Sequence, residues 1–259
     1  MISEIIALHD NNTWSLVPFE PSMNIVGCRW VYKIKLRADS AIDSYKTPLV
    51  ARGFTQQEGI DKPETFSPVV KSTTVWLVLA IAISNHWQIR QLDAHNVFLN
   101  GSFQEVVYMQ EPTSFVDHAL PTHICRLHKS LYGLKQAPRA WYTRLSDFLL
   151  SIGFRAFKVD IFLFILTMNH DICYLLVYID DILLIGNNST LLCRLISLLS
   201  SEFKLQDLGH AHYFLGIEVT PTNMGIILSH HKYALDILSR ASMSSYKPVD
   251  TPTSVSKVV

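Results

Sequence analysis

Three aspartates stand where the sequence could hold a divalent cation. Asp180 and Asp181 are adjacent and lie between two apolar, strand-like runs, and Asp93 follows a third short run. Carboxylates in apolar surroundings are costly unless they are paired or bind a cation. Aspartates at a hairpin tip and at a second strand end would supply the oxygen ligands that Mg²⁺ takes, with substrate phosphates completing its shell. The alternative is a solvated turn, in which aspartates are common.

Carboxylates in this arrangement point to two-metal phosphoryl chemistry. Two ions roughly 3.5–4 Å apart bind the attacking and the leaving oxygens of an in-line displacement. One ion lowers the pKa of the attacking hydroxyl, and the other neutralises charge on a triphosphate and on its leaving group. A nucleotide cyclase or a nuclease could share this geometry, so the aspartates alone leave these classes open.

Apolar patterning predicts the elements that would position the aspartates. Strands and helices mix without strict alternation, which predicts an α+β fold with an antiparallel sheet packed on helices. Pro138 fits the first turn of one helix. The predicted strands cover 28–36, 45–54, 88–92, 106–110, 162–166, 172–178 and 182–185, with a hairpin over 212–220 and 225–228, and the predicted helices cover 73–85, 140–152, 191–203 and 231–241.

Composition limits the class of protein. The chain has 259 residues, 49% of them hydrophobic, which is enough for a sizeable core. Its 22 basic and 22 acidic residues give no net charge. Most nucleic-acid binders are basic because counterion release drives their affinity, so basic residues would have to gather on one face.

The cysteine pattern indicates a reducing compartment, and the apolar runs predict no membrane span. The four cysteines are scattered without a C-x-x-C pair, which predicts neither a disulfide framework nor a zinc site. The first residues have no basic segment followed by an apolar core, so no signal peptide is expected. Of two apolar runs, 75–84 is too short to span a membrane, and 172–186 carries Asp180 and Asp181 at its centre.

Several segments in a fixed order resemble the reverse transcriptases of copia-type LTR retrotransposons, from about Trp14 to about Pro252. The most specific is SLYGLKQAPRAWY (130–142), which a cyclase or nuclease would not explain. The others are RWVYK (29–33), GFTQ (53–56), ETFSPVVK (64–71), QLD (91–93), YIDD (178–181) and YFLGIEV (213–219).

The resemblance implies a right-hand polymerase of the Pol polyprotein. After an N-terminal flank (1–13), the fingers would cover about 14–85, the palm about 86–220 and the start of the thumb about 221–246, followed by a linker-like tail (247–259). The implied activity is RNA-directed and DNA-directed DNA polymerisation with two Mg²⁺ ions, or Mn²⁺ in their place. The implied partners are an RNA template, a DNA primer–template and dNTPs, with no membrane. RNase H and integrase segments are absent from this sequence, and the implied location is cytoplasmic, in a virus-like particle, without secretion.

The resemblance also implies residue roles at the reacting centre. Asp93, Asp180 and Asp181 match the family's catalytic, metal-binding aspartates, and Ala94 would lend a backbone carbonyl to a metal. Phe98 falls where an aromatic ring lies under the sugar of the incoming nucleotide, leaving no space for a 2′-hydroxyl. The alternative for Phe98 is an ordinary core phenylalanine.

Further roles concern nucleotide and primer. Lys33 and Arg52 could meet phosphates, and Gln136 would pack near the nascent base pair, although lysines alternating along a strand also suit a solvated face. Lys204 is a candidate general acid toward pyrophosphate or, alternatively, a helix-capping lysine. Primer or template contacts are expected from Tyr178, Tyr213, Phe214, Leu215 and Gly216.

Departures from the family pattern leave a second hypothesis. Pro48 occupies the place of an arginine expected to clamp the triphosphate, and proline offers no phosphate contact. Ile161 replaces the usual proline after Asp160, and Val97 and Asn100 replace the common alanine and histidine. The alternative is therefore a catalytically impaired, truncated relic that keeps the fold and at most binds nucleic acid.

Overall fold

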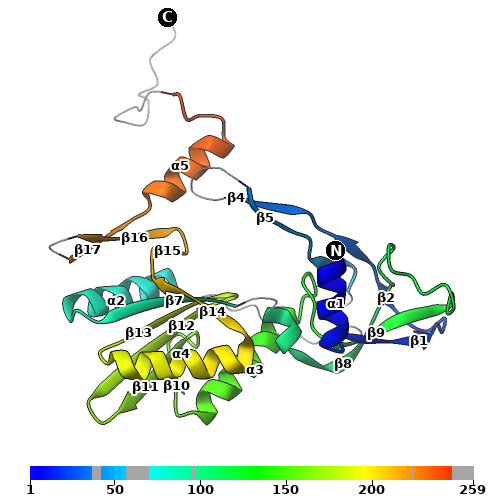
Figure 1. Cartoon of the computed structure of the whole chain (residues 1–259), viewed down its shortest axis with the longest axis horizontal. Helices are drawn as coiled ribbons and strands as arrows, with labels where there is room; N and C mark the ends of the chain where they lie inside the picture. Colours follow the sequence, from blue (N-terminus) through cyan, green and yellow to red (C-terminus); the bar gives the residue numbers. More distant parts are fainter. Residues whose placement is uncertain (37–41, 57–69, 95–96, 223–224, 247–259) are drawn as a thin grey trace, which may run out of the picture. The chain divides into compact units, whose positions relative to one another are not determined.

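The computed structural model describes residues 1–36, 42–56, 70–94, 97–222 and 225–246 (Figure 1). The chain divides into two units, Met1–Gly209 and His210–Val259, and each is described by itself. Within the described part of the chain, no helix is long and apolar enough to cross a membrane.

A six-stranded sheet forms the centre of the first unit. Its strand order is β10-β11-β12-β13-β7-β14, and the pairings from β10 through β7 are all antiparallel. The expectation of an antiparallel sheet in a mixed fold of strands and helices is therefore confirmed. The strands are β10 (Arg155–Ala156), β11 (Leu163–Met168), β12 (Asp171–Tyr178), β13 (Asp181–Gly186), β7 (Gln88–Ala94) and β14 (Leu205–His210).

The middle of this sheet is covered on both faces. Four consecutive residues of β13, Ile182 to Ile185, have no exposed surface. Because neighbouring residues of a strand point to opposite faces, protein must pack on both sides. This explains why β12 and β13 read as continuous apolar runs rather than as alternating ones.

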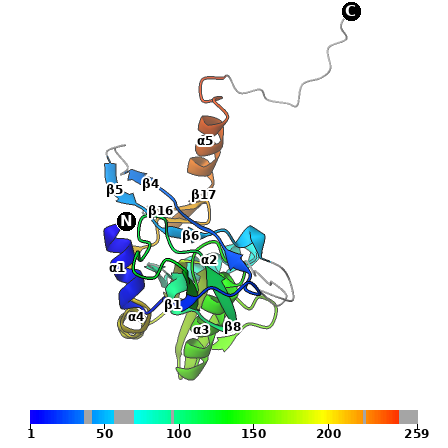
Figure 2. The same cartoon turned by 90° about the vertical axis from the view of Figure 1, so that its right-hand side faces the viewer.

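Three helices of the first unit bury apolar stripes beside the sheet: α2 (Ser72–Ser84), α3 (Ala137–Ser151) and α4 (Ser189–Phe203). In α3, which has Pro138 in its first turn as expected, the residues at helical spacing Trp141, Leu145 and Leu149 are buried. Each such side chain contributes roughly 1.5–3 kcal/mol of burial free energy. Asn188 caps the N-terminus of α4, and its side chain accepts from two backbone N–H groups. Helix α4 packs on β13, and Figure 2 shows this helix end-on.

Of a second sheet in the first unit, local patterning predicted only one strand, over 106–110, which is part of β8. The order of this sheet is β1-β9-β8-β2, and it includes one parallel pair, β2 with β8. Strand β1 pairs with β9, far away in sequence, so only the folded chain brings them together. The elements of this region are α1 (Ile2–Asp10), β1 (Trp14–Pro18), β2 (Ile25–Val26), η2 (Val97–Asn100), β8 (Ser102–Met109) and β9 (His123–Lys129).

The strands predicted over 28–36 and 45–54 pair antiparallel with each other as one hairpin, but each predicted strand is divided into two short ones. Strand β3 (Cys28–Trp30) pairs with β6 (Leu49–Ala51), and β4 (Lys33–Leu36) pairs with β5 (Ile42–Lys46). Between them, the Val31 N–H donates to the Pro48 carbonyl over 3.1 Å. Proline has no N–H to return the bond, which interrupts the ladder. The short helix η1 (Gly53–Thr55) follows β6.

The second unit contains β15 (Tyr213–Phe214), β16 (Ile217–Thr222), β17 (Gly225–Ser229) and α5 (His231–Arg240). The predicted strand over 212–220 is in fact two strands. Leu215 and Gly216 have φ of 51° and 81° and form a turn that pairs β15 with β16. The predicted hairpin with the 225–228 segment is present as β16–β17.

Candidate active site

The sheet brings the three aspartates to one end of adjacent strands. Asp93 in β7 is the direct cross-strand partner of Asp181 in β13. Partners in an antiparallel pair share one face of the sheet, with Cβ atoms about 4.5–5.5 Å apart. Asp180 lies in the two-residue turn that joins β12 to β13, and its carbonyl accepts from the Ala94 N–H over 2.9 Å. Backbone pairing therefore fixes how the three positions are related.

The donor chemistry of this end of the sheet suits a hard cation. Carboxylate oxygens are the ligands that Mg²⁺ prefers. No three acidic, histidine or cysteine side chains are drawn together as a ready metal-binding group in the described residues. Asp93 and Asp181 each make other interactions within the protein.

The turn that carries Asp180 has a strained backbone. Ile179 has φ of 53°, in the left-handed region that β-branched residues rarely adopt. Its carbonyl accepts a hydrogen bond of 2.8 Å from the Trp141 indole N–H. The turn is thus tied to α3 on one side and to β7, through Ala94, on the other.

Phe98 and Tyr132 form an aromatic pair near the aspartates. Their rings meet edge-to-face with centroids 4.7 Å apart. Burial raises the pKa of the Tyr132 phenol to about 12, and the negative charges of Asp180, Glu4 and Asp93 act in the same direction. The phenol is therefore a neutral hydrogen-bonding group at working pH.

Sequence reasoning assigned Tyr132 no role, although it stands in the most specific motif. Its place within SLYGLKQAPRAWY (130–142) is the sequence feature that could have indicated a role for Tyr132. Phe98 is buried in η2, where its carbonyl accepts from the Ser130 hydroxyl. This placement suits both a wall of the nucleotide site and an ordinary core residue.

Gln136 lies inside the protein rather than at an open surface. Its amide oxygen accepts from Gln56 Nε2 over 2.9 Å, and Gln56 Oε1 accepts from the Lys135 N–H over 3.0 Å. Two motifs far apart in sequence, GFTQ and SLYGLKQ, are thus joined by buried amides. The expected role of Gln136 near the nascent base pair stays a prediction. Because its side chain is buried, Gln136 would affect a base pair by positioning this loop.

The remaining nucleotide candidates are spread over the first unit. Lys33 lies in β4, but its side chain is outside the described part. Arg52 is exposed after β6, and its N–H donates to the Gly27 carbonyl over 2.7 Å. Lys204 is exposed and ends α4 with φ of 52°, which matches its alternative as a capping residue. Tyr178 is half-buried and pairs with Asp181.

The four expected primer-contact residues of the second unit lie around one turn. Tyr213 and Phe214 form β15, and Phe214 is fully buried. The Lys232 ammonium lies 5.1 Å from the centre of the Tyr213 ring. Leu215 and Gly216 form the turn, and the Gly216 carbonyl lies 2.9 Å from His230 Nδ1.

Asp160, which the sequence analysis named only as the residue before the departure at Ile161, has a structural role. Its buried carboxylate accepts from the Lys71 N–H over 2.9 Å at the start of α2 and from the Phe162 N–H over 3.2 Å. It therefore connects α2 to the segment that leads into β11. The ETFSPVVK motif precedes α2, and its residues 64–69 lie outside the described residues.

Comparison with known proteins agrees with the resemblance. Residues 11–255 match the family model described as reverse transcriptase (RNA-dependent DNA polymerase). The chain is 49% identical over 253 residues to the retrovirus-related Pol polyprotein from transposon RE1 of Arabidopsis thaliana, covering 97% of this chain and 17% of that protein. It is 37% identical over 255 residues to the Pol polyprotein from transposon TNT 1-94 of Nicotiana tabacum, covering 97% of this chain and 19% of that protein.

The chain thus spans less than a fifth of the length of these relatives. Among solved structures, it is similar to a foamy viral protease-reverse transcriptase in complex with double-stranded DNA. That match has 13% identity and a TM-score of 0.43 and covers 88% of this chain and 34% of the other. The family model and the curated relatives establish the family: the chain belongs to the reverse transcriptases of copia-type retrotransposon Pol polyproteins.

Proposed function

We propose that this chain copies RNA and DNA templates into DNA by two-metal nucleotidyl transfer, with Asp93, Asp180 and Asp181 as the acidic ligands. The observation that carries the proposal is the register of β7 against β13, which pairs Asp93 with Asp181 and sets Asp180 beside them. Membership of the reverse transcriptase family supports the same assignment.

The proposed division of the chain follows the right-hand plan. Residues 14–85 would form the fingers, 86–220 the palm and 221–246 the start of the thumb. The six-stranded sheet with its aspartate end supports the palm assignment, because it is the element that carries the acidic ligands. The interrupted hairpin made of the pairs β3–β6 and β4–β5 supports the fingers assignment, because it carries Lys33 and leads to Arg52.

Each residue has a distinct part in the proposed reaction. Bound Mg²⁺ ions would activate the primer 3′-hydroxyl and neutralise charge on the triphosphate. The three carboxylates and the Ala94 carbonyl would hold these ions, and Arg52 and Lys33 would attract the phosphates. Phe98 would exclude a 2′-hydroxyl, and the neutral Tyr132 phenol would keep the Phe98 ring in place through their edge-to-face contact.

The proposed partners follow from this chemistry: an RNA template, a DNA primer–template and dNTPs. The test is primer extension on homopolymer RNA and DNA templates with Mg²⁺. Asp180→Asn keeps the side-chain volume but removes the charge, so we expect extension to fall to the level of a reaction without enzyme. Asp147→Asn, at an exposed position of α3, is the matched control and should extend like the wild type. Unchanged extension by Asp180→Asn would contradict the ligand assignment.

Pro48 favours a second candidate, a relic that binds template and primer but extends poorly. The half-buried Pro48 stands between β5 and β6, where an arginine would bring a phosphate-binding guanidinium. On this alternative, the wild type binds primer–template in a filter-binding assay and shows no extension. Robust extension by the wild type would exclude it.

A further inference from the structure

We infer that Trp141 is a positioning residue for the reaction, because its indole N–H fixes the turn that carries Asp180. This inference rests on the proposed function, in which Asp180 is a metal ligand. Trp141 itself lies behind the turn and would touch neither substrate nor metal. Its effect would pass through the Ile179 carbonyl.

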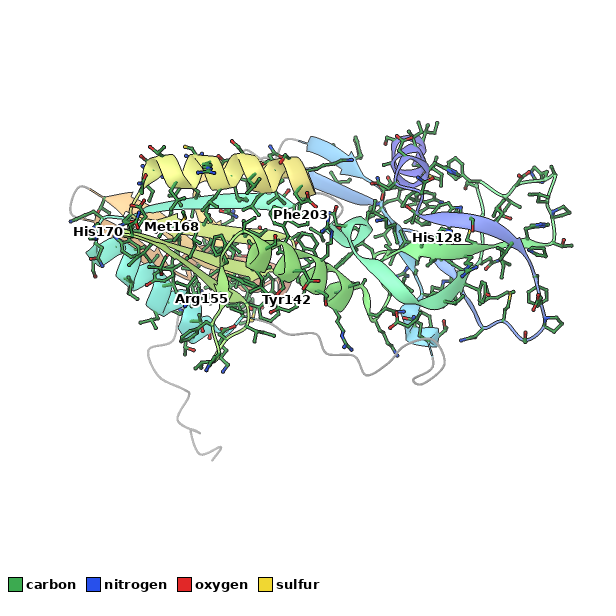
Figure 3. The ribbon with its side chains drawn as sticks, turned by 90° about the horizontal axis from the view of Figure 1, so that it is seen from below. His128, Tyr142, Arg155, Met168, His170 and Phe203 are labelled. Atoms are coloured by element: carbon green, nitrogen blue, oxygen red, sulfur yellow. The ribbon has the colours of Figure 1, made fainter. Side chains whose placement is uncertain are left out.

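Trp141 is anchored so that its indole cannot swing away from the turn. It is 2% exposed and belongs to α3. Its ring meets Phe203 edge-to-face with centroids 5.2 Å apart, and Phe203 meets Phe148 in the same manner at 5.2 Å. Figure 3 shows Phe203 where the end of α4 approaches α3. A rigid aromatic cluster between two helices therefore aims the N–H at the turn.

The turn needs such an external contact. Ile179 adopts φ of 53°, and its side chain is 38% exposed, so it is not a core residue whose packing alone would hold this conformation. Strained backbone of this kind persists where surrounding structure determines it. The surrounding structure here is the 2.8 Å hydrogen bond from Trp141 to the Ile179 carbonyl.

Two hydrogen bonds from different elements together fix the direction of the Asp180 Cα–Cβ bond. The Ile179 carbonyl, held by Trp141, sets the peptide plane before Asp180. The Asp180 carbonyl, held by the Ala94 N–H at 2.9 Å, sets the plane after it. Peptide groups are planar, so these two planes determine where the Cβ of Asp180 points. Without the indole bond, the peptide plane before Asp180 would no longer be fixed, and the direction of the Asp180 Cα–Cβ bond would vary.

A core tryptophan could also serve only to fill space. The test therefore separates the effect of the indole N–H from the effect of the ring volume. Trp141→Phe keeps an aromatic ring and removes the N–H. Benzothienylalanine incorporated at position 141 keeps the bicyclic volume and replaces only the N–H by sulfur. Trp87→Phe is the matched control, since Trp87 packs on Tyr174 and precedes the opposite end of β7.

In primer extension by the full chain, both changes at position 141 should lower kcat about tenfold. This is the rate effect expected when the loss of one hydrogen bond weakens the positioning of a metal ligand. The Mg²⁺ concentration for half-maximal rate should rise, while primer–template affinity and the KM for dNTP stay as in the wild type. Trp87→Phe should change none of these values. Normal kcat and Mg²⁺ dependence with benzothienylalanine would overturn the inference, even if Trp141→Phe is impaired.

A readout without activity separates this inference from the proposed function. The chain has five tryptophans, whose indole N–H signals can be resolved by ¹⁵N NMR. The Trp141 signal should be protected from solvent exchange, should be absent in Trp141→Phe, and should shift in Asp180→Asn. These results in a chain that does not extend primers would refute the function but keep the positioning role. A rapidly exchanging Trp141 N–H would refute the positioning role whatever the activity.

Discussion

Phe98 and Tyr132 are the side chains that would decide which sugar the site accepts. Phe98 is held in η2 and contacts Tyr132, whose raised pKa keeps it neutral beside Asp180 and Asp93. Removing part of the Phe98 ring would open space for one hydroxyl. Discrimination based on a single small group of this kind amounts to roughly 10–200-fold.

Phe98→Val should therefore lower the preference for dNTP over rNTP by about tenfold or more, measured as the ratio of the two kcat/KM values. Because Phe98 is buried, the variant should also lose stability. Phe154→Val, which shortens another buried phenylalanine just after α3, is the control for stability alone and should keep the wild-type preference. An unchanged preference in Phe98→Val would assign Phe98 to the core only.

At the scale of elements, the SLYGLKQ loop is held against β6 by close backbone contact. The Ala51 N–H donates to the Tyr132 carbonyl over 2.7 Å. Gly133 has φ of 89°, and a Cβ there would lie 2.1 Å from the Ala51 carbonyl oxygen. Glycine at this position is thus required both by conformation and by space.

Gly133→Ala should lower the free energy of unfolding by roughly 2–4 kcal/mol in urea denaturation, the sum of left-handed strain and steric overlap. Gly209→Ala is the matched control, because Gly209 has φ of 85° but a Cβ there would meet no described atom within 4 Å. It should cost only about 1 kcal/mol of strain. Equal losses in the two variants would show that the loop does not need its contact with β6.

Substitutions at Pro48 would test whether the missing arginine in the hairpin region weakens triphosphate binding. Pro48→Arg should lower the KM for dNTP, because a guanidinium can bind phosphate oxygens in pairs. Pro48→Ala restores the backbone N–H without the charge and is the control. An equal gain in both variants would attribute the effect to the repaired strand ladder, and no gain in Pro48→Arg would remove the missing arginine as an explanation for weak activity.

At the scale of the whole molecule, the fold determines which thiols can react. Burial raises the pKa of Cys28 to about 11 and that of Cys173 to about 12, and it also raises the pKa of Cys125. Cys193 on α4 is exposed. Because the thiolate is the reacting form, the raised pKa slows all three thiols, and Cys125 and Cys173 are also buried while Cys28 is half-buried.

A thiol reagent such as DTNB at neutral pH should therefore modify Cys193 first, in one fast phase. Cys193→Ser should remove this phase. Cys28, half-buried with a raised pKa, should react slowly, and the buried Cys125 and Cys173 should react only as the chain opens. Cys28→Ser is the control, since it should leave the fast phase in place. A second fast thiol in the native chain would contradict the burial described for unit Met1–Gly209.

Local sequence was enough to predict the main helices, the central strands and the family. Continuous apolar runs mark α2, β12 and β13, and apolar residues at helical spacing mark α3 and α4, because burial of apolar surface dominates folding free energy. The order of the motifs indicated the reverse transcriptase family, and the adjacency of Asp180 and Asp181 required that both lie next to one turn.

Contacts between distant residues became known only from the folded chain. The pairing of Asp93 with Asp181, of β1 with β9, and of Gln56 with Gln136 each joins segments that no local pattern connects. The hydrogen bond from Trp141 to Ile179 is of the same kind. Local patterning shows which residues of a segment are apolar and therefore buried. Strand register and side-chain contacts between segments depend instead on the packing of the whole unit.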